Sequence, residues 1–190
     1  ASPGKEKMKK IILTDIDGVV LNWSKQFDRY LARYHPDKSV KDPTTYEGYS
    51  HVIDIMREHN NSGWMGWLDP LRDARETLNQ LSIEGWEVHG CTAMGHDPYA
   101  IALRKMNLER FFPSVFNRLD TVGFGAAKED WLAQYRGQDC IWVEDKWSNA
   151  LAGASMGMKT FLMRHSYNAQ HDDKRIVKVD NWQQIYYYIN

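Results

Sequence analysis

The chain has 190 residues, of which 43% are hydrophobic, enough for one sizeable domain or a core domain with a modest insertion. Its 24 Lys and Arg residues balance 25 Asp and Glu residues, so it lacks the strong basic excess of proteins held mainly on nucleic-acid backbones, although a small basic patch is not excluded. No stretch approaches the roughly 20 consecutive apolar residues of a membrane-spanning helix. We therefore expect no membrane partner and no strong nucleic-acid binding.

The cysteines and the N-terminal segment indicate the compartment. Cys91 and Cys140 are too few for a disulfide-stabilised scaffold, and both lie in apolar runs that favour buried free thiols. Residues 1–7 are predicted to be a flexible polar leader, because the segment ASPGKEKMKK has no hydrophobic signal-peptide core. A cytoplasmic, reducing compartment fits both features.

Short β-rich runs alternate with helical patterns along the chain, which is typical of a parallel sheet in an α/β fold. Strands are predicted at Lys10–Thr14, Trp86–Cys91, Ser114–Arg118, Cys140–Val143 and Thr160–Met163. Helices are predicted between them at Leu71–Ile83, Tyr99–Met106, Ala127–Tyr135 and Asn149–Met156. The expected fold class is α/β, with a Rossmann-like, doubly wound parallel sheet.

The interval between the first two strands is too long for a simple crossover. About 70 residues separate Gly18 from Trp86, whereas one connecting helix needs far fewer. Two additional amphipathic helices and a return segment are predicted there, at Trp23–Tyr34, Tyr46–His59 and Ser62–Pro70. We therefore expect an α/β core over residues 8–22 and 68–190, and a small helical cap over residues 23–67.

Two aspartates after the first predicted strand are the strongest indication of function. In IILTDIDGVV, Asp15 and Asp17 are one residue apart and precede Gly18. Residues i and i+2 leave a strand on the same side, and ligands of doubly wound folds bind beyond the carboxyl ends of the strands. Two carboxylates this close repel each other unless a cation relieves them, and Mg²⁺ prefers oxygen ligands together with a phosphate. An Asx-type turn is the alternative without a function.

Other polar residues are predicted at the same edge of the sheet. Thr92 ends the second strand and could hydrogen-bond a phosphoryl oxygen, while Glu144 and Asp145 end the fourth strand. Lys128 opens a helix, where a cation is favoured if it faces carboxylates or phosphate. Each residue alone could be a capping, turn or surface residue. Their coincidence at one edge favours a site for a phosphate and a metal ion.

Aromatic residues of the predicted cap could recognise a base. Trp23 follows the Asp15 loop, and Trp64 and Trp67 flank the return of the cap, so these three could line the entrance and stack on a nucleobase. Tyr46 and Tyr49 are weaker candidates of the same kind. Purely structural packing is the alternative for all of them.

Two further patterns are set aside. GASMGMKT lies between a helix and a strand and has the wrong spacing for a phosphate-binding P-loop, and the seven histidines show no zinc-ligand spacing. His96 is expected to be a solvent-facing loop residue, although it lies near the predicted site.

Together these motifs resemble the haloacid dehalogenase superfamily of aspartate-nucleophile phosphatases. The four motifs are DIDGV from Asp15, HGCT ending at Thr92, AAK ending at Lys128, and WVEDKWSN at Trp142–Asn149. Within that superfamily the chain is most similar to the small 5′(3′)-deoxyribonucleotidases, which share the DxDGV opening, the short helical cap and an acidic-Asp-Lys fourth motif. The tail VDNWQQI also resembles the closing strand and helix of that group.

The resemblance implies a mechanism and a cofactor. Asp15 would attack phosphorus to form an aspartyl-phosphate, and Asp17 would act as general acid and then as general base. Mg²⁺ would be held by the Asp15 carboxylate, the Asp17 carbonyl and Asp145. Substrate phosphate would be bound by Thr92 and the adjoining backbone, with its charge offset by lysine; the candidate residues are Gly18, Thr92, Ala93 and Lys128.

The fourth motif departs from the family pattern at two positions. Glu144 precedes Asp145 where a pair of aspartates is common, so either carboxylate could be the direct metal ligand, and Asp145 is favoured. Asn149 stands where a second acid is frequent, and an amide oxygen there could lower the metal affinity.

The implied function is magnesium-dependent hydrolysis of a small phosphate ester, in particular a nucleoside monophosphate. The alternatives within the superfamily are a polynucleotide 3′-phosphatase and a sugar-phosphate phosphatase. The alternative from another class is a degenerate scaffold that binds phosphorylated ligands without turnover. A homodimer is possible.

Overall fold

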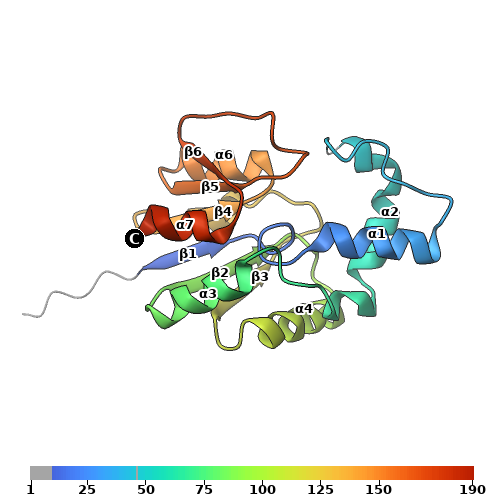
Figure 1. Ribbon diagram of the computed structural model, residues 1–190, viewed down its shortest axis with the longest axis horizontal. Coiled ribbons are helices and arrows are strands. Elements are labelled where there is room, and N and C mark those ends of the chain that lie inside the picture. Colours follow the sequence, from blue (N-terminus) through green and yellow to red (C-terminus); the bar gives the residue numbers. More distant parts are fainter. Residues whose placement is uncertain (1–9, 46) are drawn as a thin grey trace, which may run out of the picture.

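A computed structural model describes residues 10–45 and 47–190, so the predicted leader and the expectations for Tyr46 lie outside the described residues. Six strands form one parallel sheet in the order β3-β2-β1-β4-β5-β6 (Figure 1). They are β1 (Ile11–Thr14), β2 (Glu87–Thr92), β3 (Phe116–Thr121), β4 (Cys140–Glu144), β5 (Lys159–Met163) and β6 (Ile176–Val179). The predicted α/β fold is confirmed.

The strand order places a topological switch point in the middle of the sheet. From β1 the chain moves outward through β2 to β3, then crosses back to β4 on the other side of β1. Connections therefore leave β1 and β4 in opposite directions, which opens a crevice beyond their carboxyl ends. The residues that follow β1 and β4 lie at that crevice.

Helices cover both faces of the sheet because alternate residues of its strands point to opposite sides. Ile12 packs in a cluster with Leu78 of α3 (Ala74–Ile83) and Ile185 of α7 (Trp182–Ile189), whereas Leu13 packs in another with Leu132 of α5 (Glu129–Ala133). The helices of the core are α3 (Ala74–Ile83), α4 (Pro98–Phe111), α5 (Glu129–Ala133), α6 (Trp147–Ser155) and α7 (Trp182–Ile189). None of the helices in the described part of the chain has the length and apolar character to cross a membrane.

The segment after β1 forms a helical structure beyond the carboxyl ends of the strands (Figure 1). It consists of α1 (Trp23–Tyr34), the 3₁₀ helix η1 (Glu47–Val52), α2 (Ile53–Asn60) and the 3₁₀ helix η2 (Gly63–Gly66). Trp23 stacks on Phe27 with 4.6 Å between ring centroids, and His59 of α2 lies against both rings. These aromatic contacts join α1 to α2 and form the centre of the segment.

Two strands differ from the sequence prediction by more than one residue, and the single helix predicted at Tyr46–His59 is divided into the 3₁₀ helix η1 and α2. β3 begins at Phe116, not at Ser114, because Ser114 has a φ of 59°, in the left-handed region that a strand cannot use. β6 lies outside the five strands predicted from residue patterns, although the resemblance of the tail pointed to a closing strand. Its short run of four residues includes Lys178, which weakens the apolar pattern.

His59 makes the stability of this segment depend on pH. The side chain is fully buried, and neither ring nitrogen has a hydrogen-bond partner among the described residues. Burial, and then the charge of Arg104, lowers the pKa of His59 from 6.5 to about 4. The unfolded chain takes up this proton more readily, so the contribution of His59 to stability is present above pH 6.5 and is lost as the pH falls toward 4.

We expect the free energy of unfolding of the wild type to fall between pH 6.5 and 4 by up to about 3 kcal/mol more than that of His59→Phe, because the variant has no proton to take up. Urea denaturation of both proteins across this range measures the difference. Parallel pH dependences would contradict the buried, neutral state of His59.

Candidate active site

A cavity of about 430 Å³ lies between the carboxyl edge of the sheet and the helical segment after β1. The sheet side carries charged and hydroxyl groups, and the helical side carries mostly apolar ones. The sheet side includes Asp15, Asp17, Gly18, Thr92, Ala93, Lys128, Glu144, Asp145 and Asn149, and the helical side includes Trp23, Tyr49, Ile53, Met56 and Asn60. All the residues predicted to bind phosphate or metal line this cavity.

Strand pairing brings the acidic residues that follow β1 and β4 side by side at the carboxyl edge of the sheet. Thr14 of β1 pairs with Val143 of β4, and the Asp15 backbone N–H donates to the Val143 carbonyl at 2.9 Å. Asp15 therefore lies beside the end of β4, where Glu144 and Asp145 follow. On the other side of β1, Thr92 ends β2 and is almost completely buried.

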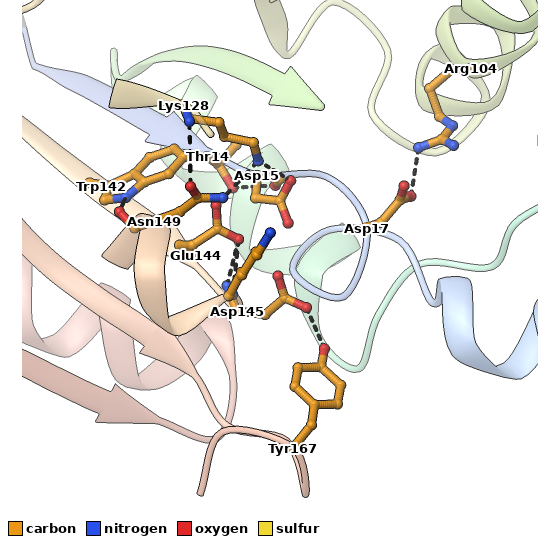
Figure 2. Close-up of polar contacts among 11 residues, drawn as sticks. Thr14, Asp15, Asp17, Arg104, Lys128, Trp142, Glu144, Asp145, Asn149 and Tyr167 are labelled. Atoms are coloured by element: carbon orange, nitrogen blue, oxygen red, sulfur yellow. Dashed lines mark hydrogen bonds and ion pairs between the residues drawn. The ribbon is translucent and has the colours of Figure 1, made fainter. Parts of the chain in front are cut away.

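Lys128 is the buried cation of the site. Its Nζ donates to Oδ1 of Asp15 at 2.5 Å and to Oε2 of Glu144 at 3.2 Å (Figure 2). Burial acts to lower the pKa of Lys128, but the charges of the two carboxylates outweigh it, so the pKa is raised. The ammonium group is therefore positively charged, although only 2% of the residue is exposed.

Asn149 does not point its amide oxygen at the carboxylates. Its Oδ1 accepts the backbone N–H of Lys128 at 3.4 Å, and its carbonyl accepts the indole N–H of Trp142 at 3.0 Å. In this structure Asn149 therefore supports the backbone that carries the lysine.

The three carboxylates hold more negative charge than Lys128 can balance. Carboxylate oxygens of Asp15, Glu144 and Asp145 lie within 4.8 Å of one another. Burial, and then Glu144, raises the pKa of Asp15 to about 7, and burial together with its acidic neighbours raises the pKa of Asp145 well above its ordinary value. A divalent cation would relieve this repulsion, and a set of hard oxygen donors suits Mg²⁺. The residues present thus fit the metal that the sequence indicates.

The two acids of the fourth motif have different surroundings. Glu144 Oε1 accepts the backbone N–H groups of Asp145 and Lys146 at 2.9 and 3.1 Å, and its Oε2 accepts Lys128. Burial acts to raise the pKa of Glu144, but the charge of Lys128, and then hydrogen bonds with the Asp145 and Asp15 side chains and the Lys146 backbone, lower it to about 2. Asp145 instead accepts a hydrogen bond from the Tyr167 hydroxyl (Figure 2). The Asp145 carbonyl accepts a hydrogen bond from Asn168 Nδ2 at 2.8 Å.

Gly18 gives the Asp15 loop the space that Asp145 needs. Its φ is 78°, and a Cβ at this position would collide with the Asp145 carboxylate. A residue with a side chain would therefore be strained and would also displace the acid. The glycine of the DIDG sequence is explained by both requirements.

Asp17 is the one predicted acid whose side chain does not lie with the carboxylates of Asp15, Glu144 and Asp145. Figure 2 shows it directed away from Asp15 and toward α4, where Arg104 Nη1 donates to its Oδ1 at 2.5 Å. Asp17 still lines the cavity. The structure thus separates the side chains of the two aspartates of the first motif.

The three predicted tryptophans have different positions. Trp23 lines the cavity, and its indole N–H donates to Asn60 Oδ1 at 2.7 Å. Trp64 and Trp67 lie outside the cavity lining. Trp64 packs edge-on against Tyr30. Trp67 is 65% exposed, and the Arg110 guanidinium lies over its ring at 4.1 Å from the centroid.

The weaker sequence candidates also differ in position. Tyr49 lines the cavity. His96 is exposed, and its ring Nδ1 lies 3.0 Å from the Thr121 hydroxyl. His96 is therefore a loop residue outside the cavity lining, in line with the expectation.

Several residues at the site carried no motif in the sequence. Phe124 and Tyr167 lie in loops, where no periodicity marks them, while Ile53 and Met56 share one face of α2. Arg104 did have a signal, because it stands between Ala100 and Leu108 at the spacing of a buried helical stripe. A charged residue in such a stripe indicates a specific partner.

Comparisons with known proteins show which sequences the chain resembles. A sequence model of the family described as 5′ nucleotidase, deoxy (pyrimidine), cytosolic type C protein matches residues 9–190. An uncharacterized 32.4 kDa protein of Enterobacteria phage T4 is 26% identical over 135 residues. That match covers 65% of this chain and 48% of the phage protein, so this chain spans about half the length of that relative.

Solved structures share the fold at low sequence identity. A haloacid dehalogenase-like hydrolase from Streptococcus pneumoniae has a TM-score of 0.66 at 13% identity, over 96% of this chain and 99% of that one. A predicted phosphatase from Clostridium acetobutylicum has a TM-score of 0.65 at 15% identity, over 96% and 99%. A hydrolase from Bacillus subtilis, bound to magnesium, has a TM-score of 0.59 at 11% identity, over 97% and 100%.

Proposed function

The chain belongs to the 5′ nucleotidase, deoxy (pyrimidine), cytosolic type C family, a group of haloacid dehalogenase-type phosphatases, and we propose on that premise that it hydrolyses nucleoside monophosphates through an aspartyl-phosphate intermediate. The observation that carries the proposal is the position of Asp15. Its carboxylate lies at the sheet side of the cavity, bonded to Lys128 and close to Glu144 and Asp145. This is a suitable environment for a nucleophile that must meet an anionic phosphate.

The proposed reaction has two steps. An Asp15 oxygen forms a bond to phosphorus while the ester P–O bond breaks, and protonated Asp17 gives its proton to the leaving oxygen. Asp17, now a carboxylate, takes a proton from water as the water oxygen attacks the aspartyl-phosphate and releases inorganic phosphate and Asp15. Lys128 offsets negative charge throughout, and we assign contacts with the phosphate oxygens to Thr92 and the backbone of Gly18 and Ala93.

We propose that Asp145, together with the Asp15 carboxylate and the Asp17 carbonyl, would hold Mg²⁺. Both carboxylate oxygens of Glu144 already accept hydrogen bonds, so its role in this proposal is to position Lys128 and the turn into α6. When bound, Mg²⁺ would neutralise charge on the transferring phosphoryl group. The magnesium-bound hydrolase from Bacillus subtilis, which has the same fold, supports this choice of ion.

The apolar half of the cavity supports a nucleoside as the group attached to phosphate. Tyr49, Ile53, Met56 and Phe124 line it, opposite the charged residues. Aromatic and aliphatic faces of this kind can bury a base while the phosphate meets the acids and Lys128. We propose residues 23–67 as the cap that closes this side, on a core of residues 8–22 and 68–190.

Release of inorganic phosphate from a substrate panel tests the proposal. We expect nucleoside monophosphates to be hydrolysed at least about 10-fold more efficiently than a sugar phosphate, which leaves the apolar half of the cavity empty, or an oligonucleotide 3′-phosphate, whose chain extends beyond the terminal nucleoside. Treatment with EDTA should reduce the activity by at least about 100-fold, and added Mg²⁺ should restore it.

The same panel separates the alternatives. A long oligonucleotide hydrolysed as well as a mononucleotide would favour a polynucleotide 3′-phosphatase and contradict the substrate assignment. Binding of phosphate esters without any release of phosphate would identify a scaffold without turnover.

A further inference from the structure

Arg104 is a buried arginine. Because burying it costs stability, its presence needs an explanation other than stability. It has no exposed surface, and its Nη1 pairs with Asp17 Oδ1, whereas its Nε and Nη2 have no hydrogen-bond partner among the described residues. A buried guanidinium with unmet donors is unfavourable, and an apolar side chain of similar size often stabilises a protein as well or better. The pairing with Asp17 is therefore better explained by function than by stability.

The helix that carries Arg104 is fixed against the segment returning from the cap. One turn further along α4, the Asn107 side chain accepts the Leu68 N–H at 2.6 Å and donates to the Leu68 carbonyl at 2.8 Å. Arg110 Nη1 donates to the Gly66 carbonyl at 2.7 Å. These contacts hold one face of α4 in place, so the guanidinium is presented to Asp17 from a rigid support.

We propose that Arg104 is a positioning residue that holds the Asp17 side chain at the leaving-group side of the cavity. The inference rests on the proposed function, in which Asp17 is the general acid. Because the guanidinium takes Oδ1, the other oxygen of Asp17 is the one left to carry the proton. In Figure 2 the Asp17 side chain points away from Asp15 and toward Arg104.

The separation of Asp17 from Asp15 suits an in-line displacement. The leaving oxygen then lies on the side of phosphorus opposite the attacking oxygen. An acid held apart from Asp15 in the same cavity can reach that oxygen, and it is kept from hydrogen-bonding to the nucleophile. Without Arg104, Asp17 would be free to rotate among several positions, and fewer of them would donate a proton productively.

The test uses two substrates that differ in their need for a general acid. A nucleoside monophosphate releases a basic alkoxide that must be protonated, whereas p-nitrophenyl phosphate releases a stable phenolate. The ratio kcat/KM is measured, because it reports the steps up to loss of the leaving group and excludes hydrolysis of the aspartyl-phosphate. Arg104→Met keeps the length and burial of the side chain and removes the contact with Asp17.

We expect Arg104→Met to lower kcat/KM for the nucleotide by about 100-fold and for p-nitrophenyl phosphate by less than about 3-fold. In the Asp17→Asn background, Arg104→Met should cause no further loss, because both changes remove the same function. Arg104→Lys, which can still donate one hydrogen bond, should recover part of the nucleotide activity. Lys105→Met, at an exposed position on the same helix, is the control and should leave both activities near the wild-type values.

Equal losses on the two substrates, or no loss on either, would overturn the positioning role. If Arg104→Met does not fold, Arg104→Lys decides the question, since a partial loss confined to the nucleotide is still required. Failure of the proposed function looks different: the wild type would then release no phosphate, or Asp17→Asn would lose both substrates equally. A normal wild type and a substrate-selective Asp17→Asn, together with an unaffected Arg104→Met, would reject this inference alone.

Discussion

Asp15→Asn is expected to lower phosphatase activity by at least about 10⁴-fold, because an amide cannot attack phosphorus to form the aspartyl-phosphate. The substitution preserves the size of the side chain. It also removes a carboxylate whose pKa burial and Glu144 raise to about 7, so it relieves repulsion in the cluster when no cation is bound. We therefore expect the variant to fold and to be about as stable as the wild type without magnesium.

The measurement is release of inorganic phosphate from a nucleoside monophosphate at saturating Mg²⁺, with circular dichroism and thermal melting to confirm folding. Asp130→Asn, an exposed position on α5, is the matched control and should keep wild-type activity. Activity of Asp15→Asn within about 10-fold of the wild type, in a folded protein, would exclude Asp15 as the nucleophile.

Lys128→Met is expected to cause the largest loss of stability. Lys128 is the cation bonded to both Asp15 and Glu144, and all three side chains are buried. Removing one partner of a buried ion-pair network leaves uncompensated charge, which costs about 3–5 kcal/mol. Activity should also fall by about 100-fold or more, because the charge that meets the phosphoryl group is lost.

The effect of magnesium on the stability of Lys128→Met gives a more specific test of the site. A cation bound by the carboxylates would supply part of the missing positive charge, so Mg²⁺ should stabilise Lys128→Met by more than it stabilises the wild type. Urea denaturation of both proteins, with Mg²⁺ and with EDTA, measures the two differences. The exposed Lys105→Met is the control and should change the free energy of unfolding by less than about 0.5 kcal/mol. Equal stabilisation of Lys128→Met and the wild type by Mg²⁺ would argue against a shared site for the lysine and the metal.

The positions of the charged residues were predictable because they depend on strand ends. Asp15, Thr92 and Glu144 each end or follow a short β-rich run, and parallel strands bring their carboxyl ends to one edge of the sheet. The helix at Trp23–Tyr34 was predicted with its observed bounds, since its apolar spacing is regular over three turns. Local pattern and sheet topology suffice for these features.

The remaining features depend on contacts between distant segments. Tyr167 reaches Asp145 from the connection between β5 and β6, and Phe124 reaches the cavity from the loop after β3; neither position has a periodicity that sequence could reveal. The sequence predicts Trp64 and Trp67 at the entrance of the site, because they flank the return of the predicted cap. Their rings instead pack on Tyr30 and Arg110, which only the tertiary arrangement decides.

Arg104 shows how sequence pattern and structure combine. Its spacing in α4 marks it as buried, but the identity of its partner requires the fold, because 87 residues separate it from Asp17. The same pairing explains why two aspartates in one motif can have separate roles. Asp15 lies among the carboxylates, and the Asp17 side chain is directed away from them toward Arg104 (Figure 2).

The most direct test of the account is a crystal structure with Mg²⁺ and beryllium fluoride, which mimics the phosphoryl group on an aspartate. We expect the fluoride adduct on the Asp15 carboxylate, with the ion bound between Asp15 and Asp145 and with Lys128 contacting the adduct. An adduct on another residue, or no ion between Asp15 and Asp145 at saturating Mg²⁺, would contradict it.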